Sequence, residues 1–190
     1  AVNAAPTTAA AAIVRNKAIW KLQQGELARH IAPDEWQYVA EHLSGIVIEE
    51  GITSIGANAF RYMEELEEVI IADGVEIIEE NAFAECSSLT SVHIDNVEAW
   101  CCIDFSNSSA NPLSYAKDLY LDGKFVTEVT IPGTVAKIEE YAFYGCTNIE
   151  KLEFSENLRF LDQYAFQKCT SLTSVKLPNS LKALSSETFS

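Results

Sequence analysis

A phenylalanine recurs at a fixed spacing along this chain of 190 residues. The five positions are Phe60, Phe83, Phe143, Phe166 and Phe189, so three of the four intervals are 23 residues long and one is 60. A sequence that repeats at such a period builds the same structural unit many times, and each unit buries its apolar face against its neighbours. The spacing therefore predicts an elongated array of repeated turns, with one interruption.

Other apolar positions repeat in step with the phenylalanine. Five residues before it stand Ile55, Ile78, Ile138, Leu161 and Leu184, and fourteen residues before it stand Ile46, Val69, Val129, Leu152 and Val175. Alternation of the type Val69-x-Ile71 is expected of a short strand with one inward face. Gly, Pro or Asn follows most of these strands and favours a turn. A period of 20 to 29 residues with this apolar spacing is typical of leucine-rich repeats.

Two stretches resemble the BspA-like leucine-rich repeats of bacterial surface proteins, which also occur in some parasitic protists: GVEIIEENAFAECSSLTSVHI and GTVAKIEEYAFYGCTNIEKLEF. The segment WCCIDFSNSSANPLSYAKDLYLDGKFVTEVTIP is similar to an insert of that family, and the resemblance covers about residues 44–190. It implies a curved, right-handed solenoid of the α/β leucine-rich-repeat type, with a parallel sheet on its inner face. It also implies a secreted or cell-surface protein used in adhesion or recognition, without cofactor or catalytic residues.

The repeats divide the chain into three parts. We expect a disordered tail at 1–12, a helical N-terminal cap at 13–43 and a solenoid of about six turns at 44–190. The cap is predicted as one helix from Ile13 to Gln24 and a second that starts at Pro33-Asp34-Glu35 and stops before Gly45. The Ala-rich start without Met fits a removed signal peptide or a chosen boundary equally well. Because the chain stops just after Phe189, within a unit, we expect a piece of a longer array or a shortened chain.

The 60-residue interval holds an insertion at about 95–128. Asp122-Gly123 lies between Leu119-Tyr120-Leu121 and Lys124-Phe125-Val126, which predicts a hairpin that follows one strand of the array. Residues 106–111 are expected to form a mobile loop. Trp100 is the insertion residue that we expect to be free for binding.

The charge balance excludes some partners. There are 28 Asp and Glu against 13 Lys and Arg, which gives a formal net charge of −15. Nucleic acids and anionic membranes bind clustered Lys and Arg, and here the basic residues are scattered. No apolar run approaches the roughly 20 residues that span a bilayer, so membrane insertion is not expected.

The sequence also gives little support for a metal site or a catalytic site. The five cysteines form no C-x-x-C pair, and no His lies at a metal-ligand spacing from them, so no zinc site or other metal is expected. Cys86, Cys146 and Cys169 share one inward column, which predicts buried thiols, while the adjacent Cys101 and Cys102 should point to opposite faces. No nucleophile-elbow, zinc-protease or phosphate-loop motif occurs, so an enzyme is not expected.

One strand column varies in character and therefore is not fixed by packing. This is the outward position thirteen residues before the phenylalanine. We predict that it binds a protein ligand together with Trp100 and the hairpin, the candidate contacts being Val47, Ile70, His93, Trp100, Thr130, Glu153 and Lys176. The partner would be a host extracellular-matrix or cell-surface protein. The alternative is a passive spacer or accessory region of a larger surface protein or secreted enzyme.

Overall fold

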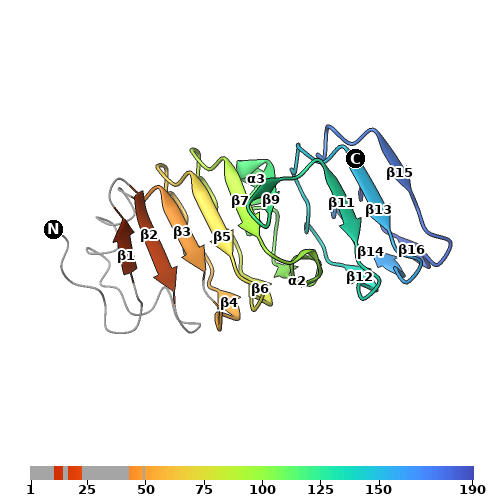
Figure 1. The fold of residues 1–190 in the computed structure, drawn as a ribbon, viewed down its shortest axis with the longest axis horizontal. Helices are drawn as coiled ribbons and strands as arrows, with labels where there is room; N and C mark the ends of the chain where they lie inside the picture. Colours follow the sequence, from red (N-terminus) through yellow and green to blue (C-terminus); the bar gives the residue numbers. More distant parts are fainter. Residues whose placement is uncertain (1–10, 15–16, 23–42, 49) are drawn as a thin grey trace.

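The computed structural model describes residues 11–14, 17–22, 43–48 and 50–190 of the chain, and nothing below concerns the others. The described chain winds into a solenoid of about six turns, in which strands of successive turns lie side by side (Figure 1). Most turns of about 23 residues contribute one strand of three or four residues and one strand of two residues. The predicted repeat solenoid is confirmed in this respect.

The longer strands form the row that faces the viewer in Figure 1. Six of them and the two-residue strand β10 form a seven-stranded sheet in the order β1-β2-β3-β5-β7-β9-β10. Their bounds are β1 Ala11–Val14, β2 Lys17–Leu22, β3 Gly45–Ile48, β5 Glu68–Ile71, β7 Ser91–Ile94, β9 Asp118–Leu121 and β10 Lys124–Phe125. From β2 to β9 all neighbours are parallel, whereas β1 and β10 are antiparallel to theirs.

Three smaller sheets complete the solenoid. One continues the row of longer strands and contains β11 Glu128–Ile131, β13 Lys151–Phe154 and β15 Ser174–Lys176. The other two consist of the two-residue strands: β4 Ser54–Ile55, β6 Ile77–Ile78 and β8 Asp104–Phe105, then β12 Lys137–Ile138, β14 Phe160–Leu161 and β16 Ala183–Leu184.

The strand register reproduces the 23-residue repeat. Ile46 is paired with Val69, Val69 with Val92, and Val92 with Leu119. All four side chains are buried, while the residue that follows each of them is half-exposed. The apolar columns of the sequence therefore form continuous ladders along the solenoid axis, as parallel pairing in register requires.

The repeating phenylalanines form the largest ladder. The rings of Phe60 and Phe83 lie 5.1 Å apart, those of Phe143 and Phe166 lie 5.0 Å apart, and Phe189 follows at 5.5 Å. In each stacked pair the backbone N–H of the earlier phenylalanine donates to the carbonyl of the residue just before the next one, as Phe60 does to Ala82 at 2.8 Å. The turns that carry the rings are thus joined to one another by backbone hydrogen bonds as well as by ring stacking.

Ala110 takes the place of the missing phenylalanine inside the insertion. Phe105 is paired with Ile78, and the backbone N–H of Phe83 donates to Ser109, so Ala110 stands level with Phe83. Ala110 and Asn111 are fully buried, and the Asn111 amide donates to Ala142 at 3.0 Å. The prediction of a mobile loop at 106–111 is wrong, because these residues form a packed, hydrogen-bonded turn of the solenoid.

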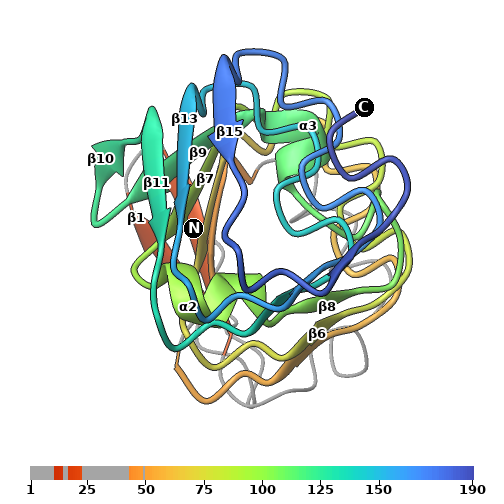
Figure 2. The same ribbon diagram turned by 90° about the vertical axis from the view of Figure 1, so that its right-hand side faces the viewer.

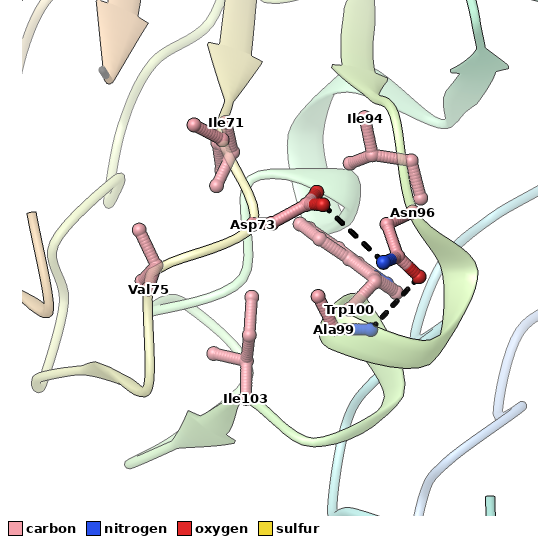
Figure 3. Close-up of a pocket in the computed structure, with 9 residues that line it drawn as sticks. Ile71, Asp73, Val75, Ile94, Asn96, Ala99, Trp100 and Ile103 are labelled. Atoms are coloured by element: carbon pink, nitrogen blue, oxygen red, sulfur yellow. Dashed lines mark hydrogen bonds between the residues drawn. The ribbon is translucent and has the colours of Figure 1, made fainter. Parts of the chain in front are cut away.

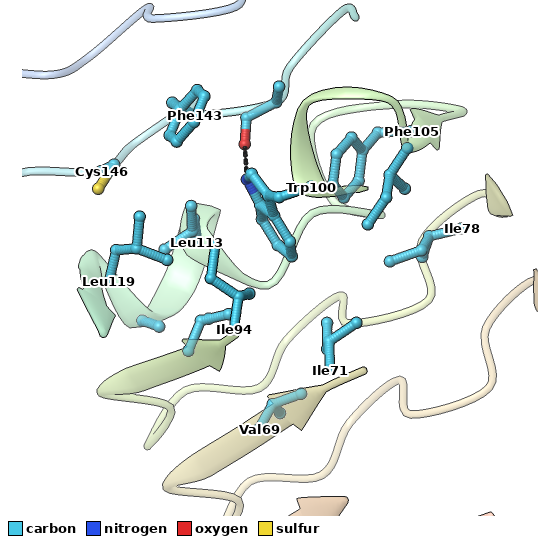
Figure 4. Close-up of a cluster of buried hydrophobic side chains, with 14 of the residues drawn as sticks. Val69, Ile71, Ile78, Ile94, Trp100, Phe105, Leu113, Leu119, Phe143 and Cys146 are labelled. Atoms are coloured by element: carbon cyan, nitrogen blue, oxygen red, sulfur yellow. Dashed lines mark hydrogen bonds between the residues drawn. The ribbon is translucent and has the colours of Figure 1, made fainter. Parts of the chain in front are cut away.

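The insertion also contains two short helices. They are α2, Val97–Cys101, and α3, Leu113–Ala116. The indole of Trp100 on α2 lies in the core between Phe105 and the Phe143 turn (Figure 4), and its Nε1–H donates to the carbonyl of Ala142 at 2.7 Å. A large side chain from α2 therefore replaces the ring that the repeat does not supply.

The hairpin divides the expected single sheet into two. After β9 the chain reverses through Asp122-Gly123 into β10, as predicted, so β11 starts a new sheet. The buried amide of Asn148 spans the interruption: its Nδ2 donates to Leu119 and Val126, and its Oδ1 accepts from the backbone N–H of Leu119. Side-chain hydrogen bonds thus supplement the single backbone bonds, such as that from the N–H of Thr147 to Lys117 at 2.8 Å, where strand pairing stops.

The structure does not contain the predicted helix over 13–24. The residues described there are the strands β1 and β2, and β2 pairs in parallel with β3. The open edge of β3 offers backbone hydrogen bonds, and such tertiary pairing outweighs a weak helical propensity. The second predicted helix, from Pro33 to the residues before Gly45, lies outside the described residues except for its end.

Replacing Phe83 with alanine should lower the free energy of unfolding by about 3–5 kcal/mol, because the fully buried ring would leave a cavity in the ladder. Thermal and urea denaturation measure the effect. Phe160→Ala is the matched control, since Phe160 is 42% exposed and should cost less than about 1 kcal/mol. Equal losses in the two variants would contradict the ladder.

Asn148→Ala should destabilise the chain by about 2–4 kcal/mol, because the N–H of Leu119 and the carbonyl of Val126 lose their partner in a buried place. The carbonyl of Leu119 keeps only its bond from the backbone N–H of Val126. Asn157→Ala is the control: its amide also donates to a carbonyl, that of Gly133 at 2.9 Å, but at an exposed site where water replaces it. A melting temperature that falls equally in both variants would show that Asn148 does not join the two sheets.

Candidate protein-binding face

Three of the predicted outward positions lie in one line with Tyr120 across the seven-stranded sheet. Val47 is paired with Ile70, Ile70 with His93, and His93 with Tyr120. The residues on either side of each point into the core, so these four side chains turn away from it and are half-exposed. The strand alternation confirms that Val47, Ile70 and His93 share the outer surface of the sheet.

Aromatic rings extend this line onto the hairpin. The rings of His93 and Tyr120 are stacked at 4.5 Å, and Phe125 on β10 meets Tyr120 edge-on at 5.5 Å. Phe125 is 51% exposed. In the end-on view of Figure 2, β10 lies outside the ring of the other strands, so the hairpin projects beside the sheet. We call Val47, Ile70, His93, Tyr120 and Phe125 the outer row.

Two members of this row, Tyr120 and Phe125, were not predicted from the sequence. Tyr120 stands between the inward residues Leu119 and Leu121, and this alternation was the signal that could have placed it in the outward column. Phe125 follows once the hairpin register is known, because it is paired with Tyr120. The strongest aromatic character of the surface therefore comes from the insertion.

The other predicted strand positions lie on the second sheet. Thr130, Glu153 and Lys176 are paired in one exposed line across β11, β13 and β15. Beside them Lys151 bridges Glu128 at 3.5 Å and Glu153 at 3.0 Å. This face is polar and two of its carboxylates are paired with Lys151, so the seven predicted residues do not form one uniform site.

Trp100 is not available to a ligand, and its prediction as a contact residue is wrong. Its side chain is 1% exposed, and its indole N–H is already bonded to Ala142. Beside the indole lies a cavity of about 10 Å³, room for about one water molecule, lined among others by Ile71, Asp73 and Asn96 (Figure 3). There the Asn96 amide donates to Asp73 at 3.2 Å and its oxygen accepts from the first turn of α2, so these polar groups position the helix.

Three of the cysteines occupy the inward column, as predicted. Burial raises the pKa of the Cys86 thiol to about 12, and it does the same for Cys169. Cys101 is also buried while its neighbour Cys102 is exposed, which confirms the expected split of that pair. The pKa of Cys102 is raised as well, first by partial burial and then by the nearby carboxylates of Glu139 and Glu98.

Within the described part of the chain, no group of three or more His, Cys, Asp or Glu residues could hold a metal ion. The same residues contain no helix that is long and apolar enough to cross a membrane.

Iodoacetamide at mildly alkaline pH should alkylate only Cys102 in the folded protein, and more slowly than it alkylates free cysteine. The raised pKa of Cys102 keeps most of its thiol in the protonated, unreactive form at this pH. Burial keeps the reagent away from the other four cysteines. Mass spectrometry of tryptic peptides measures the modification. Labelling of Cys146 at the rate of Cys102 would contradict the burial of the column.

Comparison with known proteins agrees with the repeat architecture. The BspA type leucine-rich repeat region matches residues 31–121 and 116–190, in six copies. A search of curated proteins finds no match.

Several solved structures resemble the chain weakly. A leucine-rich repeat protein from Bacteroides ovatus is 21% identical with a TM-score of 0.45, over 94% of this chain and 48% of that one. The pneumococcal vaccine antigen PcpA is 19% identical with a TM-score of 0.44, over 73% and 40%. A leucine-rich cell surface protein from Faecalibacterium prausnitzii is 17% identical with a TM-score of 0.43, over 90% and 53%. The chain thus spans about half or less of these proteins. Since the family's repeat matches most of its length, the chain belongs to the BspA-type leucine-rich repeat family.

Proposed function

We propose that this chain is a non-catalytic protein-recognition module whose contact surface is the outer row. The observation that carries the proposal is the continuous line of half-exposed apolar and aromatic side chains, from Val47 to Phe125, on a hydrogen-bonded sheet. With a strand spacing of roughly 4.8 Å, five neighbouring positions extend over about 19 Å, which suits the centre of a protein interface. Aromatic residues at such a centre commonly supply most of the binding energy.

The second sheet extends the proposed surface with polar groups. Thr130, Glu153 and Lys176 lie on β11, β13 and β15, which continue the strand row beyond the hairpin (Figure 1). Polar, solvated residues at the edge of an interface contribute less affinity than its centre and more to orientation. We assign these three residues to the edge of the interface.

The location and the class of partner are part of the same proposal. A secreted or cell-surface protein that adheres to or recognises proteins of a host or neighbouring cell fits the family to which the chain belongs. The net charge of −15 argues for a protein partner rather than nucleic acid or an anionic membrane.

Phe125→Ser should weaken capture of a protein ligand at least tenfold, because a half-exposed aromatic at an interface centre is worth about 1.4 kcal/mol or more. The measurement is surface plasmon resonance of the purified chain against a panel of extracellular-matrix and cell-surface proteins. Ile70→Ser, in the middle of the row, should act in the same direction.

Phe160→Ser provides the matched control, since Phe160 is 42% exposed but lies on β14, outside the outer row. It should leave the affinity unchanged. Equal affinity of the Phe125 and Phe160 variants, or the absence of any captured protein in the panel, would contradict the proposal and favour a passive spacer.

A further inference from the structure

Carboxylates stand at both ends of β9, which carries Tyr120, and at the end of β7, which carries His93. Asp118 is the first residue of β9, two positions before Tyr120. Asp95 follows the end of β7 and Asp122 follows the end of β9, where the backbone N–H of Asp122 donates to Ile94. Two residues along a strand correspond to roughly 6.6 Å, so carboxylates flank the stacked rings of His93 and Tyr120 from both directions.

These flanking carboxylates make no ion pair with a described residue, unlike the acidic groups around Lys137 and Lys151. Lys137 lies between Glu139 at 2.6 Å and Asp162 at 2.9 Å, and Lys151 lies between Glu128 and Glu153. Among the described residues, no basic side chain lies within the 4.0 Å of an ion pair from Asp95, Asp118 or Asp122. The nearby Lys117 and Lys124 are exposed and make no such pair with them. We call Asp95, Asp118 and Asp122 the acidic rim.

A fourth carboxylate on the same surface, that of Glu68, lies next to His93. Glu68 starts β5, and its Oε1 lies 3.5 Å from Nε2 of His93. It adds negative charge beside the row, but it already has a partner, so we do not count it in the rim.

We infer that the partner of the outer row is a cationic protein segment, in which an apolar or aromatic side chain is flanked on both sides by Lys or Arg. The inference rests on the proposed function and specifies its partner. The apolar centre would bury against Ile70, Tyr120 and Phe125, while the flanking cations would meet the acidic rim. Charges placed around an apolar contact exclude partners of the wrong sign and speed encounter with the right one. The overall excess of 28 acidic over 13 basic residues acts in the same direction at longer range.

The test uses synthetic extended peptides and the full chain. The basic probe carries Leu-Trp-Leu at its centre and paired Lys and Arg residues on both sides, with a fluorescein label. One comparison peptide replaces every Lys and Arg by Glu, and another replaces Leu-Trp-Leu by Ser-Ser-Ser. Fluorescence anisotropy should show binding of the basic probe, weaker binding at higher salt, and at least tenfold weaker binding of both comparison peptides.

Variants of the chain test whether the acidic rim attracts the basic probe. Asp95→Asn, Asp118→Asn and Asp122→Asn should each weaken binding of the basic probe about threefold, and the triple variant about 27-fold, as for exposed ion pairs that add over separate sites. The control changes three exposed carboxylates outside the face: Glu65→Gln, Asp104→Asn and Glu156→Gln. It alters the net charge equally and should change the affinity less than twofold, with thermal melting reported for both triple variants.

The outcomes separate the two claims. If the Glu-bearing peptide binds as well as the basic probe, or the rim variant binds as tightly as the control variant, the inference of a cationic partner is overturned. If Phe125→Ser nevertheless abolishes that binding, the proposed recognition surface stands. If neither Phe125→Ser nor the rim variant weakens binding of the basic probe, both claims fail.

Discussion

The structure depends on parallel pairing in register between successive turns. A single turn of about 23 residues has too few internal contacts to offset its backbone entropy, so its apolar columns must meet those of the turns before and after it. Register fixes which face of each strand is buried, and a slip by one residue would turn Val69 outward and Ile70 inward. The stacked phenylalanines apply the same constraint at the turns, where each ring stacks on the equivalent ring of the next turn.

The insertion shows what happens where this constraint is interrupted. Ala110 supplies no ring and β10 runs antiparallel, so both ladders would stop between Phe83 and Phe143. Trp100 and Asn148 restore continuity through side chains, one by filling the core and bonding to Ala142, the other by bonding to the ends of the hairpin. The hairpin is then free to project from a supported base, and it places Tyr120 and Phe125 on the outer surface. A break in the repeat thereby becomes the most aromatic part of that surface.

The positions of residues within the repeat could be predicted from the sequence, whereas those of residues outside the repeat could not. Columns such as Ile55 and Ile78 are predictable because one chemical type recurs at one spacing, and the outward Val47 and Ile70 follow from alternation. Trp100 interrupts the pattern, and a tryptophan outside a repeat looks like a contact residue until its hydrogen bond to Ala142, 42 residues away, is known. The strands β1 and β2 escaped prediction for a similar reason, since the spacing of Ile19 and Leu22 suits a helix and only the edge of β3 selects a strand.

The side chains of Trp100 and Asn148 join the two sheets into one cooperative support for the outer row. Hydrogen exchange with mass spectrometry in increasing urea tests this cooperativity, because it measures the free energy of opening for each segment. Peptides from β5 and β7 and peptides from β11 and β13 should exchange through a common opening, with the same free energy and the same dependence on urea. Two separate openings, with the second sheet exchanging at lower urea while the first stays protected, would contradict the claim.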